Sequence, residues 1–295
     1  MNSAPGVLVI AGPTASGKTE LALSLAKRFD AEIVSADSRQ IYAGMPLGTA
    51  APTEEQLRAV PHHLVGFLDP YERYSAARFA ADAAAAIEAI HRRGKRAIVA
   101  GGTGFYIRAL TGGVALAPQY DESLRDRLAH ESRVHDAEFL YEWLRVRGSR
   151  RAAALYPADT YRVLRALEVA LAPEYTPERV VMPPDIRFLK IALQTSEEAL
   201  WQAINARTDA MLAGRFVEEA ERIGAGAVAA NAVGYPQALA YLRGWSSFDE
   251  FRELLIRRTC RYAKRQMTWF RSEPQMIWAQ ARDVERLAKE NLAWV

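Results

Sequence analysis

The eight residues from Gly12 to Thr19 read GPTASGKT and fit the pattern G-x-x-x-x-G-K-[ST]. An apolar run, residues 7–11, comes directly before them, and a helix-like stretch over residues 18–29 follows. A glycine-rich turn in that setting directs backbone N–H groups and the positive end of the next helix at phosphate oxygens. Lys18 adds a positive charge, and the Thr19 hydroxyl is a natural ligand for Mg²⁺. The predicted diphosphate- or nucleotide-binding residues are Gly12, Pro13, Thr14, Ala15, Ser16, Gly17, Lys18 and Thr19.

Two other segments offer chemistry at the ends of predicted strands. Asp37 follows the apolar run 31–36, at the carboxyl end of a strand, where open α/β sheets bind ligands. Its carboxylate could be a general base, could orient Mg²⁺, or could cap the segment that follows. The run 96–100 ends in Gly101–Gly104 (GGTG), where glycines permit close approach to a ligand and Thr103 offers a hydroxyl. A plain strand-to-helix turn explains that segment equally well.

A cationic run lies near the C-terminus. Between residues 257 and 271 there are six cations and no Asp or Glu. On a helix, Arg257, Arg261, Lys264 and Arg265 share one face. Tyr262 and Trp269, seven residues apart, add aromatics that could stack on bases while the cations follow a phosphate backbone. A solvated cationic face whose aromatics belong to the core is the alternative.

The elements that must hold these residues alternate between strands and helices. Residues 7–11, 31–36 and 96–100 are predicted strands, and residues 18–29 and 76–93 are predicted helices. This alternation indicates an α/β fold, a P-loop parallel sheet with helices on both faces.

The alternation of predicted strands and helices stops after Gly112-Gly113. Residues 121–172 are predicted to be helical almost throughout, with one helix starting near Asp159, and a Pro-rich loop follows at 173–184. A strand is predicted at 186–193, then a helix opened by a capping box of Thr195 and Glu198. We therefore expect a P-loop core over 1–113, a helical insertion over 114–185, and the second part of the core with basic C-terminal helices over 186–295.

The composition is that of an ordinary soluble globular protein, with half of the 295 residues hydrophobic and a quarter charged. No apolar stretch approaches the roughly 20 residues of a membrane span, and the first strand begins too early for a signal peptide. Cys260 has no partner for a disulfide, and the pair His62-His63 is interpreted as loop packing rather than a metal site. The expectation is a cytoplasmic monomer without a structural metal. The net charge of +3 is only a weak pointer to an anionic partner.

Several segments together resemble one family, the tRNA dimethylallyltransferases, or isopentenyl transferases. They occur in the family's order and spread over almost the whole chain. The segments are Gly12–Thr19 (GPTASGKT), Ser35–Tyr42 (SADSRQIY), Gly44–Pro52 (GMPLGTAAP), Pro61–His63 (PHH), Asp69–Phe79 (DPYERYSAARF), Gly101–Tyr106 (GGTGFY), Arg162–Val169 (RVLRALEV), Val233–Tyr235 (VGY) and Ala263–Arg271 (AKRQMTWFR).

The resemblance implies transfer of a dimethylallyl group from its diphosphate to the exocyclic N6 amine of the adenosine beside the tRNA anticodon, position 37, with Mg²⁺ as cofactor. The adenosine would have to leave its stack to reach the site. Lys18, the loop amides and Mg²⁺ on Thr19 would then stabilise the departing diphosphate. By resemblance, Asp37 takes the proton from, or orients, the amine, Thr103 belongs to the reacting centre, and Arg207 binds the diphosphate. Residues expected at the tRNA are Asp37, Ser38, Arg39, Gln40, Thr103, Arg125, Arg162, Arg165, Val233, Gly234, Tyr235, Lys264 and Arg265.

The chain departs from the family pattern in two places. The family often has a basic residue where this chain has Pro236, and a second arginine where it has Ala203. Two other functions fit the P-loop taken alone. A small-molecule kinase would use ATP and leave the cationic helix unexplained. A nucleic-acid-binding protein without chemistry would need neither Asp37 nor Thr103. The sequence leaves open whether ATP competes for the loop.

Overall fold

The computed structural model describes residues 6–112, 121–149, 152–172 and 186–294. The chain divides into two compact units, residues 1–113 with 181–295 and residues 114–180. The predicted Pro-rich loop at 173–184 lies outside the described residues.

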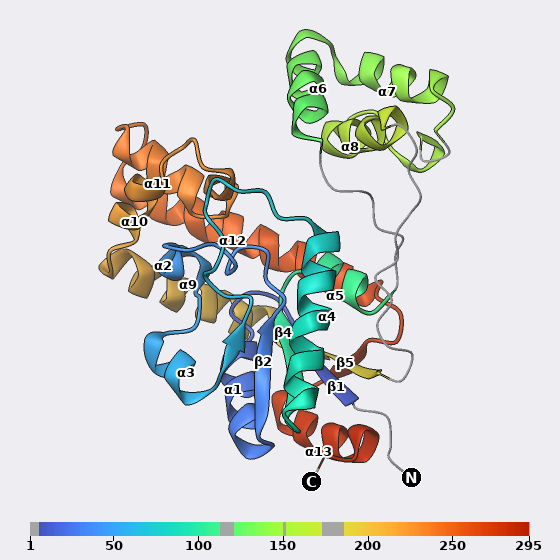
Figure 1. The fold of residues 1–295 in the computed structure, drawn as a ribbon. Helices are drawn as coiled ribbons and strands as arrows, with labels where there is room; N and C mark the ends of the chain where they lie inside the picture. Colours follow the sequence, from blue (N-terminus) through green and yellow to red (C-terminus); the bar gives the residue numbers. More distant parts are fainter. Residues whose placement is uncertain (1–5, 113–120, 150–151, 173–185, 295) are drawn as a thin grey trace. The chain divides into compact units, whose positions relative to one another are not determined.

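The first unit contains a six-stranded sheet in which every strand pair is parallel (Figure 1). The strand order is β3-β2-β4-β1-β5-β6. This confirms the predicted parallel sheet, and adds two short edge strands that the sequence did not reveal. The strands are β1 (Gly6–Ala11), β2 (Ala31–Ser35), β3 (His62–His63), β4 (Arg96–Gly101), β5 (Arg187–Leu193) and β6 (Ile277–Ala279).

Helices cover both faces of the sheet because the strands are apolar on both sides. Along β1, Val7 and Val9 face one core, while Leu8 and Ile10 face the other. The second core is covered by α1 (Lys18–Arg28) and α13 (Ala281–Leu292). The first is covered mainly by α4 (Ala76–Arg92), α5 (Gly104–Leu110) and α12 (Phe248–Arg271), and Figure 1 shows α4 running along β2 and β4.

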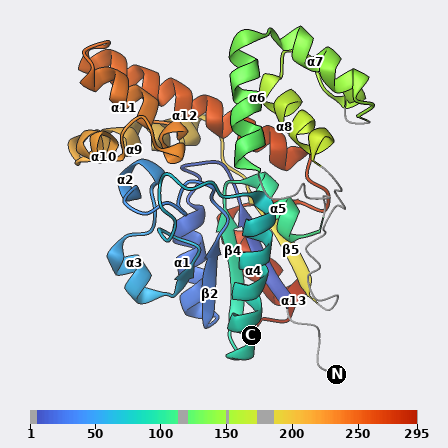
Figure 2. The ribbon, with the colours of Figure 1, turned by 45° about the horizontal axis from the view of Figure 1, so that its top comes forward.

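The remaining helices of this unit are short or lie toward one end of it. Figures 1 and 2 both show α2, α10 and α11 gathered at the same end, with α9 and α12 beside them. These helices are α2 (Pro46–Thr49), α3 (Glu54–Ala59), α9 (Glu197–Ala213), α10 (Phe216–Ile223) and α11 (Tyr235–Leu242). The predicted capping box of Thr195 and Glu198 is wrong, because the N-cap is one residue later and its N3 residue is Ala199. Ser196 is the N-cap of α9 and accepts a hydrogen bond from the N–H of Ala199, because its backbone is the last extended one before the helix.

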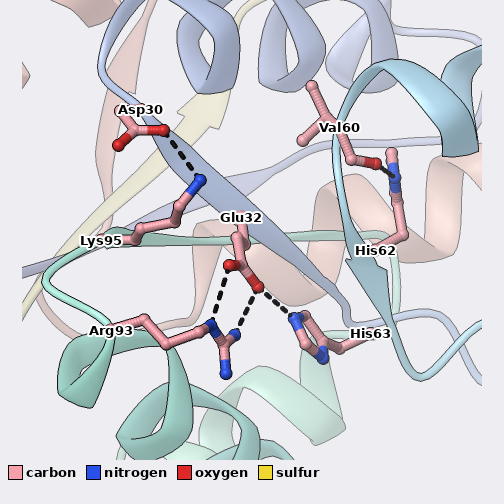
Figure 3. Close-up of polar contacts among 7 residues, drawn as sticks. All are labelled: Asp30, Glu32, Val60, His62, His63, Arg93 and Lys95. Carbon is pink, nitrogen blue, oxygen red and sulfur yellow. Dashed lines mark hydrogen bonds and ion pairs between the residues drawn. The ribbon is translucent and has the colours of Figure 1, made fainter.

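A buried carboxylate fixes edge strand β3 to the sheet (Figure 3). Glu32 on β2 accepts hydrogen bonds from the Arg93 guanidinium at 2.6 and 3.2 Å, and lies 2.7 Å from His63 Nε2. Burial raises the pKa of Glu32, but the bonds from Arg93 and His63 outweigh burial and hold it below its ordinary value. The His pair was expected to pack in a loop; it forms β3 instead, because Glu32 and strand pairing hold it.

The second unit is a small helical bundle formed by α6 (Glu122–Val134), α7 (Ala137–Val146) and α8 (Thr160–Leu171). Its core includes Leu140, Leu144 and Val163. Asp159 caps α8, as the sequence indicated. In the part of the chain that the structure describes, no helix is long and apolar enough to cross a membrane.

Candidate active site

The phosphate loop connects β1 to α1, as its sequence setting predicts. Ala15 and Gly17 both have left-handed backbones, with φ of 63° and 77°. Placed in a turn, such residues direct successive N–H groups into a shared concavity, which is a site for an anion. The Ser16 hydroxyl is buried without a hydrogen-bond partner among the described residues. The loop is therefore shaped before any ligand arrives.

Lys18 begins α1 and extends back along the loop, where its Nζ donates to the Pro13 carbonyl at 3.1 Å. Burial lowers the pKa of Lys18 to about 8. The charge of Asp37 works against this shift, and that of Arg207 adds to it. An ammonium that is costly to keep charged in the free protein gains most when an anion joins it.

Asp37 and Thr103 come from neighbouring strand ends and lie together. Thr103 Oγ1 accepts from the backbone N–H of Ser38 at 2.9 Å and lies 3.3 Å from the Ser38 hydroxyl. One Asp37 oxygen accepts from the N–H of Arg39 at 2.9 Å, in a turn rather than a helix cap. The other Asp37 oxygen accepts no hydrogen bond from the described residues, so that oxygen can accept a proton.

Three distant segments meet at Thr14. The Arg207 guanidinium, from α9, donates to the Thr14 hydroxyl at 2.6 Å. The Gln266 side chain, from α12, accepts from the Thr14 N–H at 2.8 Å and donates to the Gly102 carbonyl at 2.9 Å. Burial lowers the pKa of Arg207 from its ordinary value, yet a guanidinium stays protonated. The loop thus has two cations beside it, Lys18 and Arg207.

A cavity of about 190 Å³ joins these groups. Lys18, Asp37 and Arg207 line it together with apolar side chains of α9 and α12 such as Met211 and Leu255. A second cavity, only about 20 Å³, is lined by Lys18, Asp37 and Thr19. Each cavity contains Lys18 and Asp37, so the predicted anion site and the predicted base share their surroundings.

Of the residues expected at RNA, some line the larger cavity or are exposed, and others are bonded inside the protein. Arg39 and Val233 line the larger cavity, and Lys264 and Arg265 are exposed on α12. Gln40 is used internally, since its Nε2 donates to the Ala50 carbonyl at 2.9 Å. Ser38 contacts Thr103 as described above.

Tyr235 is fully buried, and its hydroxyl donates to Glu219 at 2.7 Å. Burial and the neighbouring Glu219 carboxylate raise the pKa of this phenol. Gly234 precedes it with φ of 108° as the N-cap of α11. The side chain of Tyr235 therefore stabilises α11 and α10, and any RNA contact by this segment falls to Val233 and Gly234.

Arg125, Arg162 and Arg165 belong to the helical unit. Arg162 is mostly exposed and pairs with Asp159 at 3.3 Å. Arg165 forms an ion pair with Glu168 at 2.8 Å.

Sequence reasoning missed one residue of the site, Gln266, and it named Tyr262 only as an aromatic that could stack on bases, not as a partner of Thr103. Tyr262 lines the larger cavity and hydrogen-bonds Thr103, and burial raises the pKa of its hydroxyl to about 12. A signal for Gln266 was present: Ala263, Gln266 and Phe270 are spaced as the buried stripe of α12, so a polar residue stands among apolar ones.

Comparisons with known proteins identify the family of this chain. The IPP transferase family profile matches residues 40–273, and the isopentenyl transferase profile matches residues 5–65. The tRNA dimethylallyltransferase of Geobacter sulfurreducens is 42% identical over 284 residues, covering 93% of this chain and 91% of that protein. The tRNA dimethylallyltransferase 2 of Syntrophus aciditrophicus is 40% identical over 296 residues, covering 97% and 95%.

Solved structures of the same family resemble this chain. The full-length tRNA isopentenylpyrophosphate transferase of Bacillus halodurans superposes with a TM-score of 0.70 at 33% identity, covering 97% of this chain and 95% of that one. A eukaryotic dimethylallyltransferase acting on tRNA gives a TM-score of 0.75 at 26% identity, covering 97% of this chain and 76% of that one. This chain belongs to the IPP transferase family, whose curated relatives are the tRNA dimethylallyltransferases.

Proposed function

We propose that this protein transfers a dimethylallyl group from dimethylallyl diphosphate to the N6 amine of the adenosine beside the anticodon, position 37 of the tRNA. The observation that carries the proposal is the shared cavity in which two cations, Lys18 and Arg207, lie with the carboxylate of Asp37. Cations suit a diphosphate, and the carboxylate suits an incoming amine.

The phosphate loop holds the leaving group. As the allylic C–O bond breaks, negative charge grows on the diphosphate oxygens, and stabilising that charge lowers the barrier. The amides around Ala15 and Gly17, the Lys18 ammonium and the Arg207 guanidinium are fixed before the substrate binds. Their preorganisation means that little reorganisation is needed during bond cleavage.

Asp37 receives the proton of the amine. The N6 nitrogen forms a bond to the allylic carbon, the diphosphate departs with the C–O electron pair, and the nitrogen then gives up one proton. One Asp37 oxygen is held by the N–H of Arg39, while the other accepts no hydrogen bond from the described residues, so the carboxylate is oriented and able to accept. Thr103, which shares hydrogen bonds with Ser38, holds this strand end in place.

Mg²⁺ fits the smaller cavity. Thr19 offers its hydroxyl there, and no group of three or more His, Cys, Asp or Glu suitable for a metal occurs in the described ranges. Such a sparse oxygen set suits Mg²⁺, which takes most of its ligands from water and substrate phosphates. The ion would neutralise charge on the departing diphosphate.

The tRNA anticodon loop is the acceptor in this proposal. The base must leave its stack to reach Asp37, and flanking phosphates then need cations. Arg39 at the cavity and the exposed Lys264 and Arg265 on α12 provide them. Arg125, Arg162 and Arg165 offer further cations on the helical unit.

The test is direct. The protein is incubated with Mg²⁺, labelled dimethylallyl diphosphate and unmodified tRNA, and the label on RNA is followed. Label at the adenosine beside the anticodon is expected. ATP consumption with a small acceptor and no labelled RNA would instead indicate a kinase. RNA binding without either product would indicate a binding protein that lacks chemistry.

A further inference from the structure

One face of α12 is packed against the reaction centre. Three side chains spaced one helical turn apart, Tyr262, Gln266 and Trp269, contact the GGTG segment or the phosphate loop. Tyr262 hydrogen-bonds Thr103, and Trp269 packs so closely on Gly104 that a Cβ there would overlap its ring. Thr103 is therefore held between contacts on both sides.

Gln266 is the member of this face that contacts two segments of the site at once. Its Oε1 accepts from the Thr14 N–H at 2.8 Å, and its Nε2 donates to the Gly102 carbonyl at 2.9 Å. The amide leaves no room for a side chain at Gly102, since a Cβ there would overlap Nε2. Only 6% of Gln266 is exposed, and the residue lines the larger cavity.

We propose that Gln266 is a positioning residue that ties the diphosphate loop and the Thr103 strand end to α12. This inference rests on the proposed function and deepens it. The neighbouring Lys264 and Arg265 are exposed on the same helix, so the helix that presents cations to RNA also sets the loop that holds the leaving group. A side-chain amide suits this position because it donates and accepts in one plane, whereas a carboxylate or an apolar chain lacks one or both bonds.

The test separates diphosphate binding from RNA binding. Gln266→Leu removes both bonds and leaves the partly buried N–H of Thr14 without its Gln266 partner. Its affinity for inorganic pyrophosphate with Mg²⁺, measured by calorimetry on the full chain, is expected to fall about tenfold, the effect of removing one or two hydrogen bonds. The kcat for transfer should fall with it, while the tRNA Kd, measured without pyrophosphate, stays within about twofold.

Two other variants complete the design. Gln266→Glu keeps the acceptor for Thr14 and places an oxygen against the Gly102 carbonyl, so it should also weaken pyrophosphate binding. Gln202→Leu makes the matched change at an exposed glutamine of α9 that bonds Glu198 one turn away, and should leave both affinities unchanged. Should the leucine variant fail to fold, the glutamate variant, which has the same shape as the native residue, is judged by the same criteria.

Several results would overturn the proposal. If a folded Gln266 variant kept the native pyrophosphate affinity and the native kcat, Gln266 would not position the phosphate loop. A lower melting temperature or a smaller binding-competent fraction with an unchanged Kd would show a purely structural role. Equal losses of affinity for tRNA and pyrophosphate would place Gln266 in RNA binding. Failure of the proposed function is distinct, because it appears as unlabelled RNA with the native protein.

Discussion

Asp37 combines two properties that a general base needs, orientation and a free oxygen. The N–H of Arg39 fixes one oxygen of the carboxylate, and the cavity shared with Lys18 and Arg207 surrounds the group with positive charge. In the proposed reaction the same cations hold the leaving diphosphate, so the proton is accepted and the diphosphate departs in the same positively charged cavity.

The first prediction concerns this carboxylate. Asp37→Asn keeps the shape of the side chain and its acceptor for the N–H of Arg39, but removes the base. We expect kcat for labelled transfer to fall by about 10²–10⁴, with tRNA affinity nearly unchanged. Single-turnover kinetics and filter binding measure the two quantities. A parallel loss of both would mean that Asp37 mainly binds RNA or supports the fold.

The second prediction uses the pKa of Lys18, which burial lowers to about 8. Below that pH the side chain is an ammonium and attracts a diphosphate; as pH rises through 8 it becomes neutral and the attraction disappears. Pyrophosphate affinity of the free protein should therefore decline between about pH 7 and pH 9.5. Calorimetry across this range measures it.

Lys18→Arg is the control, because a guanidinium stays charged over this whole pH range. Pyrophosphate itself titrates in the same way with both proteins, so the difference between their two pH profiles reports Lys18 alone. Parallel pH profiles for the two proteins would rule out Lys18 as the titrating group.

At the scale of elements, the two faces of α12 differ in what they contact. Its buried stripe carries Gln266 to the loop, while its exposed side carries cations. Helix α9 makes a similar link, since Arg207 reaches Thr14 from it. Without these contacts from α9 and α12, the phosphate loop would be attached only to β1 and α1. The two helices add bonds from the C-terminal part of the chain.

The third prediction tests the exposed side of α12. Replacing both Lys264 and Arg265 by Ala should weaken tRNA binding and reduce the slope of log K against log salt, by roughly 1 for each phosphate that the protein no longer neutralises. Filter binding at several salt concentrations measures the slope.

Arg286→Ala on α13 is the matched control. That arginine is paired with Glu290, and α13 packs on the opposite core from α12. The slope of log K against log salt for Arg286→Ala should equal that of the native protein. An unchanged slope in the Lys264 and Arg265 double variant would show that these two cations do not bind RNA.

At the scale of the whole molecule, the sheet carries the site on its carboxyl edge and a buried ion cluster near the start of β2. Glu32 joins the edge strand β3 to the end of α4 through His63 and Arg93. This cluster has no role in the proposed reaction, and its contribution is to stability. Burial of a carboxylate is costly, and two hydrogen-bonded partners offset that cost.

The fourth prediction follows from the lowered pKa of Glu32. A folded pKa below the unfolded value of 4.5 means that the unfolded chain binds the proton first on acidification. The stabilisation is fully present above pH 4.5 and disappears as pH falls through the lower folded pKa. Urea unfolding from pH 7 to pH 3 should show this decline in the native protein and a shallower acid limb in Glu32→Gln. Identical limbs would contradict the assignment.

The residues of the phosphate loop, Asp37 and Thr103 could be found from the sequence because their signals are local. A glycine pattern between an apolar run and a helix fixes backbone geometry over eight residues, and a polar residue directly after a buried strand must lie at the sheet edge. The segment order that resembles isopentenyl transferases pointed to the same family that the comparisons support, over the kinase alternative. Such patterns need no knowledge of distant contacts.

Only the tertiary structure decided what meets these residues. Gln266 lies 252 residues from Thr14, and Arg207 lies 193 residues away, so no local pattern could pair them. The edge strand β3 is two residues long and exists because Glu32 and β2 hold it. Short-range sequence fixes backbone preference and periodicity, whereas side-chain partners depend on how folded elements pack, which is a property of the whole chain.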